Sequence, residues 1–215
     1  MSDTPRRPVV FDAALVRAAY RDAGAALLDM VAAVPQDAWD RAGLGEWTVR
    51  DLVGHAGRSF VTVSEYLRAG EGQPLSLRHS FDYGQAAALI AADPGAVTER
   101  GRAAGRALGQ DPVGGLTRLF DNAVADVAAA PDEAPCATLV GVMRLVDYLP
   151  SRIFELIVHT DDLAQALGTT VPAPVTARVV ALTFAAGLAG ESERYAVALR
   201  ALTGRGLPPG GFSVV

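Results

Sequence analysis

Glu155 and His159 stand one helical turn apart in the mostly aliphatic stretch IFELIVHTDDLAQALG, which covers residues 153–168. Side chains four positions apart on a helix are neighbours, with Cβ atoms about 5–6 Å apart. Two explanations are open from this stretch alone. The two residues form a weak Glu–His contact on a solvent-facing stripe, or both side chains bind one metal ion.

His55 offers a third group of the same kind. It lies in a second expected helix, at residues 48–68, on the flank of the apolar stripe and therefore at the seam with a neighbouring helix. Alone, such a histidine is more often a partly buried structural residue. Together with Glu155 and His159 it completes a His₂Glu set, which in catalytic zinc sites leaves the fourth position to water or substrate.

The other candidate residues are assigned smaller roles. Asp162 and Arg152 flank the ligand pair on the same helix face, and Asp162 is in reach of the His159 ring. We expect both to support the ligands from behind, because ligating histidines usually donate their second N–H to a carboxylate or carbonyl. His79 lies in a loop and is expected at the surface. Cys136 lies in an expected linker, and a catalytic thiol is not favoured there.

Composition and charge exclude several classes of function. Half of the 215 residues are apolar, 20% are charged and the net charge is −5, which fits one folded domain and argues against a nucleic-acid or anionic-membrane surface. All 19 basic residues are arginine, so lysine Schiff-base chemistry is excluded. One cysteine, no signal-peptide pattern and no run of 18 apolar residues predict a soluble, cytoplasmic protein.

The apolar pattern is helical almost throughout, without convincing two-residue alternation, and predicts an all-α protein. Capping residues and prolines delimit the helices, and Asp147 is expected to cap the helix that carries Glu155. The simplest architecture is a bundle of four long antiparallel helices. The expected helices cover residues 12–35, 48–68, 81–93, 94–108, 112–130, 147–168 and 174–202, with a linker at 130–141.

Two separated stretches carry a family resemblance. GEWTVRDLVGHAGRS resembles the W-[ST]-x-x-[DE]-L-x-x-H signature of the DinB-like superfamily, and DYLPSRIFELIVHTDDLAQALG resembles the R-x-x-E-x-x-x-H-x-x-D-L-A segment of its mycothiol-dependent maleylpyruvate isomerase branch. The resemblance implies a DinB-like up-down four-helix bundle with additional short helices and a C-terminal helix. It implies His55, Glu155 and His159 as ligands of a divalent metal, usually zinc. We expect the metal-binding bundle at residues 8–170, with a C-terminal helix and tail at 171–215.

The resemblance also implies an activity. The metal would activate a small cytosolic thiol, mycothiol, whose thiolate adds to a cis double bond and leaves after rotation; in transferase relatives the adduct stays. Arg152 is the candidate for binding a dianionic substrate, while a salt bridge to Glu155 or Asp162 is the competing role. Well-studied isomerases carry a separate C-terminal domain, whereas only about 45 residues follow the metal helix here. The alternatives are a non-catalytic metal-binding bundle and a metal-hydroxide hydrolase. The expected partners are a small-molecule substrate and a thiol, in a monomer or homodimer.

Overall fold

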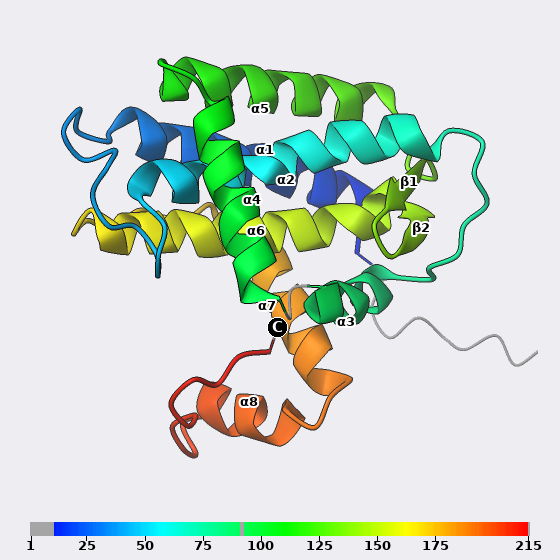
Figure 1. Cartoon of the computed structure of the whole chain (residues 1–215). Coiled ribbons are helices and arrows are strands. Elements are labelled where there is room, and N and C mark those ends of the chain that lie inside the picture. Colours follow the sequence, from blue (N-terminus) through cyan, green and yellow to red (C-terminus); the bar gives the residue numbers. More distant parts are fainter. Residues whose placement is uncertain (1–10, 91–92, 215) are drawn as a thin grey trace, which may run out of the picture.

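Four long helices form a bundle in the computed structural model, which describes residues 11–90 and 93–214 (Figure 1). The four are α1 (Ala13–Ala32), α2 (Val49–Gly70), α5 (Pro112–Ala129) and α6 (Leu145–Ala166). Helix α6 contacts both α1 and α2, and α5 contacts the same two helices from the other side. The predicted all-α bundle is therefore confirmed. Residues 8–10 of the expected bundle domain lie outside the described residues.

Side-chain caps determine where α1 and α2 begin. The Asp12 carboxylate accepts a hydrogen bond from the Leu15 N–H (2.8 Å) at the start of α1. Thr48 and Asp51 form a complete capping box at the start of α2. Because such caps satisfy N–H groups that the helix leaves free, they place the first turn of each helix accurately. The register of α2, and with it the direction of the His55 side chain, follows from this cap.

A long crossover separates α2 from α5. It contains α3 (Ser80–Ile90) and α4 (Pro94–Ala107), and it carries the chain back so that α2 and α5 run in the same direction (Figure 1), whereas the sequence predicts four antiparallel helices. Helix α4 lies directly on α2, where a Cβ on Gly54 would be 2.2 Å from the Gly105 nitrogen. The two glycines therefore permit a backbone contact that any larger residue would prevent. The third helix is expected to end near Asp93. Residues 91–92, just before Asp93, lie outside the described residues, and the structure describes α3 as far as Ile90.

The expected linker at 130–141 is wrong, because most of it belongs to a hairpin. Strands β1 (Pro135–Thr138) and β2 (Gly141–Arg144) pair antiparallel, with Cys136 opposite Met143. Four residues per strand are too few for a two-residue alternation to be recognised in the sequence. The Val142 carbonyl also accepts the backbone N–H groups of residues 76 and 77, which ties the loop after α2 to the hairpin.

The expected capping role of Asp147 is also wrong. Helix α6 begins at Leu145, and the Leu145 N–H donates to the Ala134 carbonyl (2.8 Å), so the hairpin supplies the partner that a side-chain cap would provide. Asp147 lies in the first turn and accepts a hydrogen bond from Arg144. Pro150 consequently lies inside the helix rather than in its first turn.

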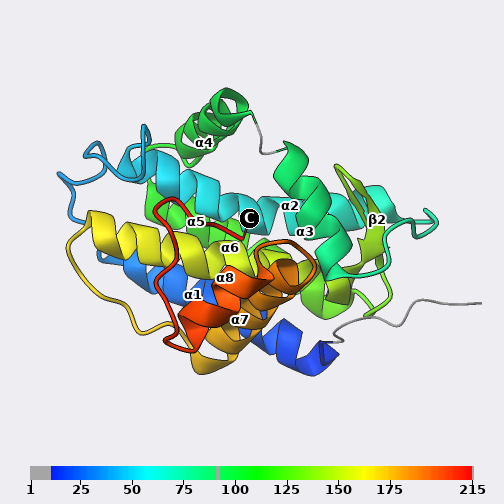
Figure 2. The same cartoon turned by 90° about the horizontal axis from the view of Figure 1, so that it is seen from below.

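The last expected helix is divided in two, α7 (Val175–Gly190) and α8 (Tyr195–Leu202). Ser192 interrupts it, because its hydroxyl donates to the Ala189 carbonyl and accepts from the Arg194 N–H. Side chains of this kind compete with helical hydrogen bonds and favour turns. Helix α7 packs on α1 and α6, whereas α8 has no buried residue and lies below the bundle in Figure 1, on the side that faces the viewer in Figure 2.

His79 is not a surface residue, and that expectation is corrected here. Its side chain is only 16% exposed, and Nδ1 accepts the Phe81 N–H at the start of α3. The imidazole therefore serves as a cap of α3. Among the described residues, no helix has the length and the apolar composition needed to span a lipid bilayer.

Candidate metal centre

Helices α2 and α6 bring His55, Glu155 and His159 together. One ligand atom from each of the three lies within 4.8 Å of the other two. The Glu155 Oε2 atom is 3.1 Å from His159 Nε2 and 4.0 Å from His55 Nε2. The His55 and His159 rings meet edge to face, with centroids 4.8 Å apart. Two segments a hundred residues apart in the sequence thus converge on one point.

Both faces of α6 pack against other parts of the bundle. The apolar face carries Leu149, Ile153, Leu156 and Leu163, all of which are fully buried in the core. On the polar face, Glu155 and His159 contact His55 of α2 and therefore point toward that helix rather than away from the protein. The side chain of His159 is 12% exposed and that of Glu155 is 33% exposed. The polar stripe of α6 therefore lies between α6 and α2 and is not a solvent-facing surface.

The donor set fits a divalent transition metal such as zinc. Two imidazoles and one carboxylate are a known catalytic zinc set, and bonds of about 2.1 Å to tetrahedral zinc place ligand atoms about 3.4 Å apart. The two separations from Glu155, 3.1 and 4.0 Å, lie on either side of that value. His55 Nδ1 is buried without a hydrogen-bond partner among the described residues, so no hydrogen bond opposes a small rotation of the ring toward the other two ligands.

Nearby charges and hydrogen bonds make Glu155 and His159 a charged pair in the metal-free protein. Burial acts to raise the pKa of Glu155, but the hydrogen bond from His159 and the nearby Arg152 charge outweigh it and lower that pKa to about 2. Burial acts to lower the pKa of His159, but its hydrogen bonds to Asp162 and Glu155 raise that pKa to about 9. Near neutral pH the metal-free pair is therefore Glu⁻–HisH⁺.

His55 has the opposite electrostatic character. Burial, and then the neighbouring His159, lower the pKa of His55 to about 4. Its ring is therefore neutral near pH 7, and a nitrogen lone pair is available to a metal. Binding at this centre requires the loss of a proton from His159 only.

Asp162 lies behind His159, where the sequence analysis placed it. Its Oδ2 atom is 2.9 Å from His159 Nδ1, and Glu155 is on the other nitrogen. The carboxylate thus fixes the orientation of the ring and leaves Nε2 directed at the shared point. Such outer partners raise the basicity of a ligating imidazole.

The Trp47 indole packs against the ring of His55, whose Nδ1 atom has no hydrogen-bond partner among the described residues. The two rings lie 4.4 Å apart, centroid to centroid, at an angle of 34°. The indole N–H donates to the Thr98 carbonyl in α4 (3.0 Å), which holds the indole in place. A Cβ on Gly101 would lie 2.5 Å from the indole, so this glycine leaves the space that the ring occupies.

Arg152 does not form the ion pair that competed with a substrate-binding role. Its guanidinium stacks on the rings of Tyr83 and Tyr148, with 5.5 and 5.1 Å to the two centroids, and donates to the Tyr83 hydroxyl (3.3 Å). No carboxylate oxygen of the described residues lies within 4.0 Å of it. A partly buried cation without a paired anion can attract an anionic ligand.

A cavity of about 210 Å³ adjoins His55 and Glu155. Three arginines line it: Arg58 from α2, Arg100 from α4 and Arg152 from α6. Within the described part of the chain, none of the three has an acidic partner within 4.0 Å. Tyr66 and Tyr83 line the same cavity. Among the described residues of the lining, Glu155 is the one carboxylate, so the three arginines give the cavity a net positive charge.

Comparison with known protein families matches residues 20–164 to the mycothiol maleylpyruvate isomerase N-terminal domain. The chain belongs to this family. The match covers all of α2 and α6 as far as Ala164, and therefore includes all three candidate ligands, Arg152 and Asp162. The family resemblance inferred from the two sequence motifs is confirmed. No curated protein and no solved structure matches the chain.

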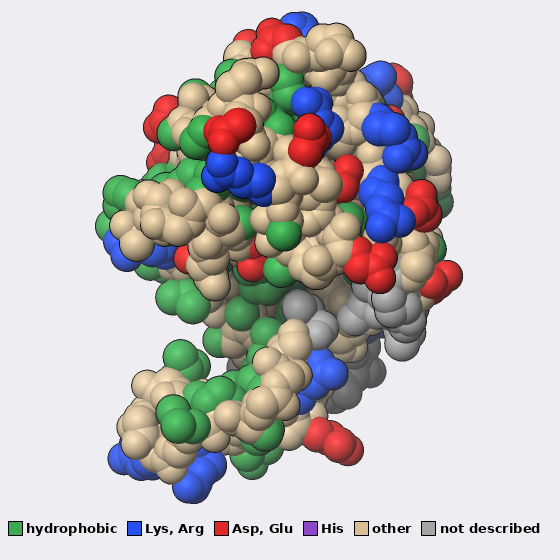
Figure 3. All heavy atoms as spheres, turned by 60° about the vertical axis from the view of Figure 1, so that its left-hand side comes forward, with side chains coloured by type: hydrophobic (Ala, Val, Ile, Leu, Met, Phe, Trp, Pro, Cys, Tyr) green, Lys and Arg blue, Asp and Glu red, His purple; other side chains and the backbone are tan. Residues whose placement is uncertain are grey.

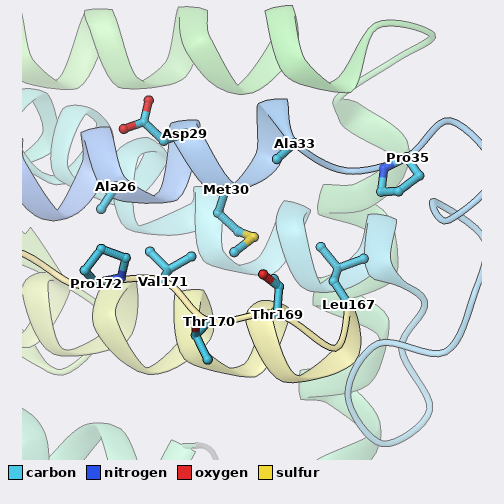
Figure 4. Close-up of a pocket in the computed structure, with 10 residues that line it drawn as sticks. All are labelled: Ala26, Asp29, Met30, Ala33, Pro35, Leu167, Thr169, Thr170, Val171 and Pro172. Carbon is cyan, nitrogen blue, oxygen red and sulfur yellow. The ribbon is translucent and has the colours of Figure 1, made fainter.

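A second cavity lies at the end of α1, and the family match does not indicate chemistry there. This cavity, of about 440 Å³, lies between α1 and the segment after α6 (Figure 4). Figure 4 shows the Met30 side chain pointing toward Thr169, whereas the Asp29 carboxylate points away. Asp29 is the one ionisable side chain of this lining. One carboxylate cannot form a metal or anion site, so the candidate centre of this family member lies between α2 and α6.

The sequence analysis missed several residues of the centre. Arg58 was recognisable, because it follows His55 by three positions and therefore shares its helix face. Tyr83 and Arg100 carry no such signal, since they reach the cavity through the crossover helices α3 and α4. The stacking of Trp47 on His55 was also not expected, although Trp47 belongs to the motif that indicated the family.

Proposed function

We propose that the protein is a metal-dependent enzyme that uses mycothiol to isomerise a small, unsaturated, anionic substrate. One observation carries the proposal: a His₂Glu cluster borders a cavity lined by three arginines that have no acidic partner among the described residues. The family match supports the thiol and the reaction class. In this proposal residues 8–170 form the metal-binding bundle, and residues 171–215 form an extension of it.

His55, Glu155 and His159 would hold the divalent metal, with zinc as the first candidate. When bound, the metal would supply the acidity that keeps a coordinating thiol deprotonated near neutral pH. Glu155 and the neutral His55 are ready for this role, and His159 releases one proton to take it. Asp162 and Trp47 keep the two imidazoles in orientation.

The arginines would bind and polarise the substrate. Guanidinium groups suit carboxylates because they donate two parallel hydrogen bonds. At about 210 Å³ the cavity is smaller than the roughly 300–1,000 Å³ of sites for drug-sized ligands, so a small acid fits best. When a nucleophile adds to a conjugated double bond, negative charge moves to the acid or carbonyl oxygens. Arg152 and Arg58, which line the cavity, would stabilise that charge.

The protein itself offers no suitable sulfur nucleophile. Cys136 is fully buried in the hairpin, and burial raises its pKa to about 12. A thiol that stays protonated and inaccessible cannot attack a substrate. An exogenous thiol that adds, permits rotation and leaves again is regenerated, so the reaction needs no oxidant or reductant.

Turnover of a cis-unsaturated diacid such as maleylpyruvate, with and without mycothiol, tests the proposal. The zinc-loaded protein should form the trans isomer only when mycothiol is present. Arg152→Gln should raise KM without changing metal content, whereas Arg118→Gln, at an exposed position of α5, should leave both unchanged. Equal turnover without the thiol would refute the thiol mechanism. A stable thiol adduct in place of the isomer would assign the protein to the S-transferases instead.

A further inference from the structure

Helix α7 is apolar on two opposite sides, although only one side packs on the bundle. The inner side contributes Ala177, Val180, Phe184 and Leu188, which are buried against α1 and α6 or beside α3. The outer side carries Val175, Val179, Leu182 and Ala186, which are exposed and follow one another at helical spacing. A helix that is hydrophobic all round is normally buried all round.

Helix α8 adds a second exposed apolar stripe. Tyr195, Leu199 and Leu202 are spaced one turn apart, and none of its eight residues is buried. Isolated helices of fewer than about 12–15 residues are marginal in water, so α8 needs a packing partner. Figure 3 shows α8 as a lobe set apart from the bundle, with hydrophobic side chains on both sides of the hollow between them.

We propose that this α7–α8 face is the interface of a homodimer, in which α7 packs antiparallel on α7 of a second copy and α8 flanks the pair. A two-fold axis allows one surface to cover itself, so a single self-complementary patch is sufficient. The spacing of the α7 stripe suits helix–helix packing, and the small side chain of Ala186 permits close approach.

The size of the face agrees with a dimer. Its six large side chains are between 51% (Val179) and 72% (Leu202) exposed. Five of the six are aliphatic, so at about 150 Å² for a whole side chain, the lower end of the range for aromatic residues, they offer on the order of 550 Å² of surface. Monomers rarely expose contiguous apolar patches of more than a few hundred Å². A typical stable interface buries about 800 Å² on each partner.

Charge complementarity favours a second copy over an unrelated partner. Arg178 is an exposed cation beside the first turn of the α7 stripe, and Glu193 is an exposed anion just after the end of α7. Neither residue has an ion-pair partner within the described part of the chain. Antiparallel pairing brings the beginning of one α7 close to the end of the other, so Arg178 approaches the partner's Glu193 twice across the axis.

Light scattering coupled to size exclusion, over a wide range of protein concentrations, tests the interface. The wild-type protein should have twice the 22.3 kDa mass of one chain. Leu182→Glu and Leu199→Glu should each give a folded monomer by circular dichroism and mass. Leu75→Glu, at an exposed leucine in the loop after α2, should remain dimeric. A wild-type monomer at every concentration, or a dimer that survives both glutamate variants, would overturn the proposal.

A charge swap and a cross-link test the antiparallel geometry. Arg178→Glu should weaken the dimer, and the double variant Arg178→Glu/Glu193→Arg should restore it. Leu182→Cys, near the middle of α7, should form a disulfide-linked dimer on mild oxidation, whereas Ala103→Cys on the exposed face of α4 should not. The native Cys136 does not interfere because it is fully buried. A swap that fails to restore the dimer, or cross-linking through position 103 instead, contradicts the arrangement.

Discussion

Replacing Asp162 by asparagine should weaken metal binding by about 10–100-fold, the usual effect of removing an outer partner of a ligating histidine. Asp162 Oδ2 lies 2.9 Å from His159 Nδ1, and the other ring nitrogen faces Glu155. Asparagine keeps the size of the side chain but removes its negative charge. The variant therefore tests electrostatic support of the ring without creating a cavity.

The size of the loss should depend on pH. In the metal-free protein the pKa of His159 is about 9, because hydrogen bonds to Asp162 and Glu155 outweigh the opposing effect of burial. Asp162 thus strengthens the binding of a proton and of a metal at the same ring. Below pH 9 the metal must displace the proton of His159, and Asp162→Asn holds this proton less tightly than the wild type does. Part of the loss is therefore cancelled near pH 7, and the full loss appears above about pH 9.

Competition with a chromophoric chelator at several pH values measures this effect. The neighbouring residue Asp161 provides a matched control, because it is exposed on the same helix turn and, among the described residues, its carboxylate bonds only to Gln165. Asp161→Asn should bind zinc like the wild type at every pH. Equal zinc affinity in Asp162→Asn and wild type at high pH, or an equal loss in both variants, would refute the reasoning.

Three further predictions concern the same region. Gly101→Ala should lower zinc affinity about tenfold, the lower end for outer-shell changes, because its methyl group displaces the Trp47 indole from His55. Unchanged affinity, or an equal loss in the exposed α4 control Gly95→Ala, contradicts this. Cys136, with a pKa of about 12 from burial, should react with thiol reagents only on unfolding, and rapid labelling of the native protein contradicts it. The folded-state pKa of His159, about 9, exceeds its unfolded value of about 6.5, so the thermal stability of the metal-free protein should fall as pH rises from about 6.5 through 9. A flat profile of stability against pH, or the same fall in His159→Gln, contradicts this.

The elements that carry strong local signals were predictable from the sequence. Asp12, Thr48, Asp93 and Asp111 all cap helices in the structure, because an N-cap acts within one turn of its own chain. Helical periodicity was sufficient to place Glu155 and His159 one turn apart on α6 and His55 beside the apolar stripe of α2. The convergence of the three side chains on one metal was implied by the family resemblance of the two motifs.

Features that depend on contacts between distant segments were not predictable. The start of α6 at Leu145 depends on a carbonyl of the hairpin, and the hairpin itself is too short to leave a pattern. Arg100 reaches the cavity only because Gly54 and Gly105 let α4 lie on α2. The break after Gly190 depends on hydroxyl bonds of a single serine, which helical periodicity does not register.

The central claim is that His55, Glu155 and His159 hold one metal whose remaining position accepts an external thiol. Zinc K-edge X-ray absorption of the zinc-loaded protein, before and after addition of mycothiol, tests it most directly. We predict one zinc per chain with only nitrogen and oxygen neighbours at about 2.0–2.2 Å, joined on thiol addition by one sulfur at about 2.3 Å. The spectrum should be the same in Cys136→Ala. Failure to bind one equivalent of zinc, or a first shell that gains no sulfur when the thiol is added, would contradict the claim.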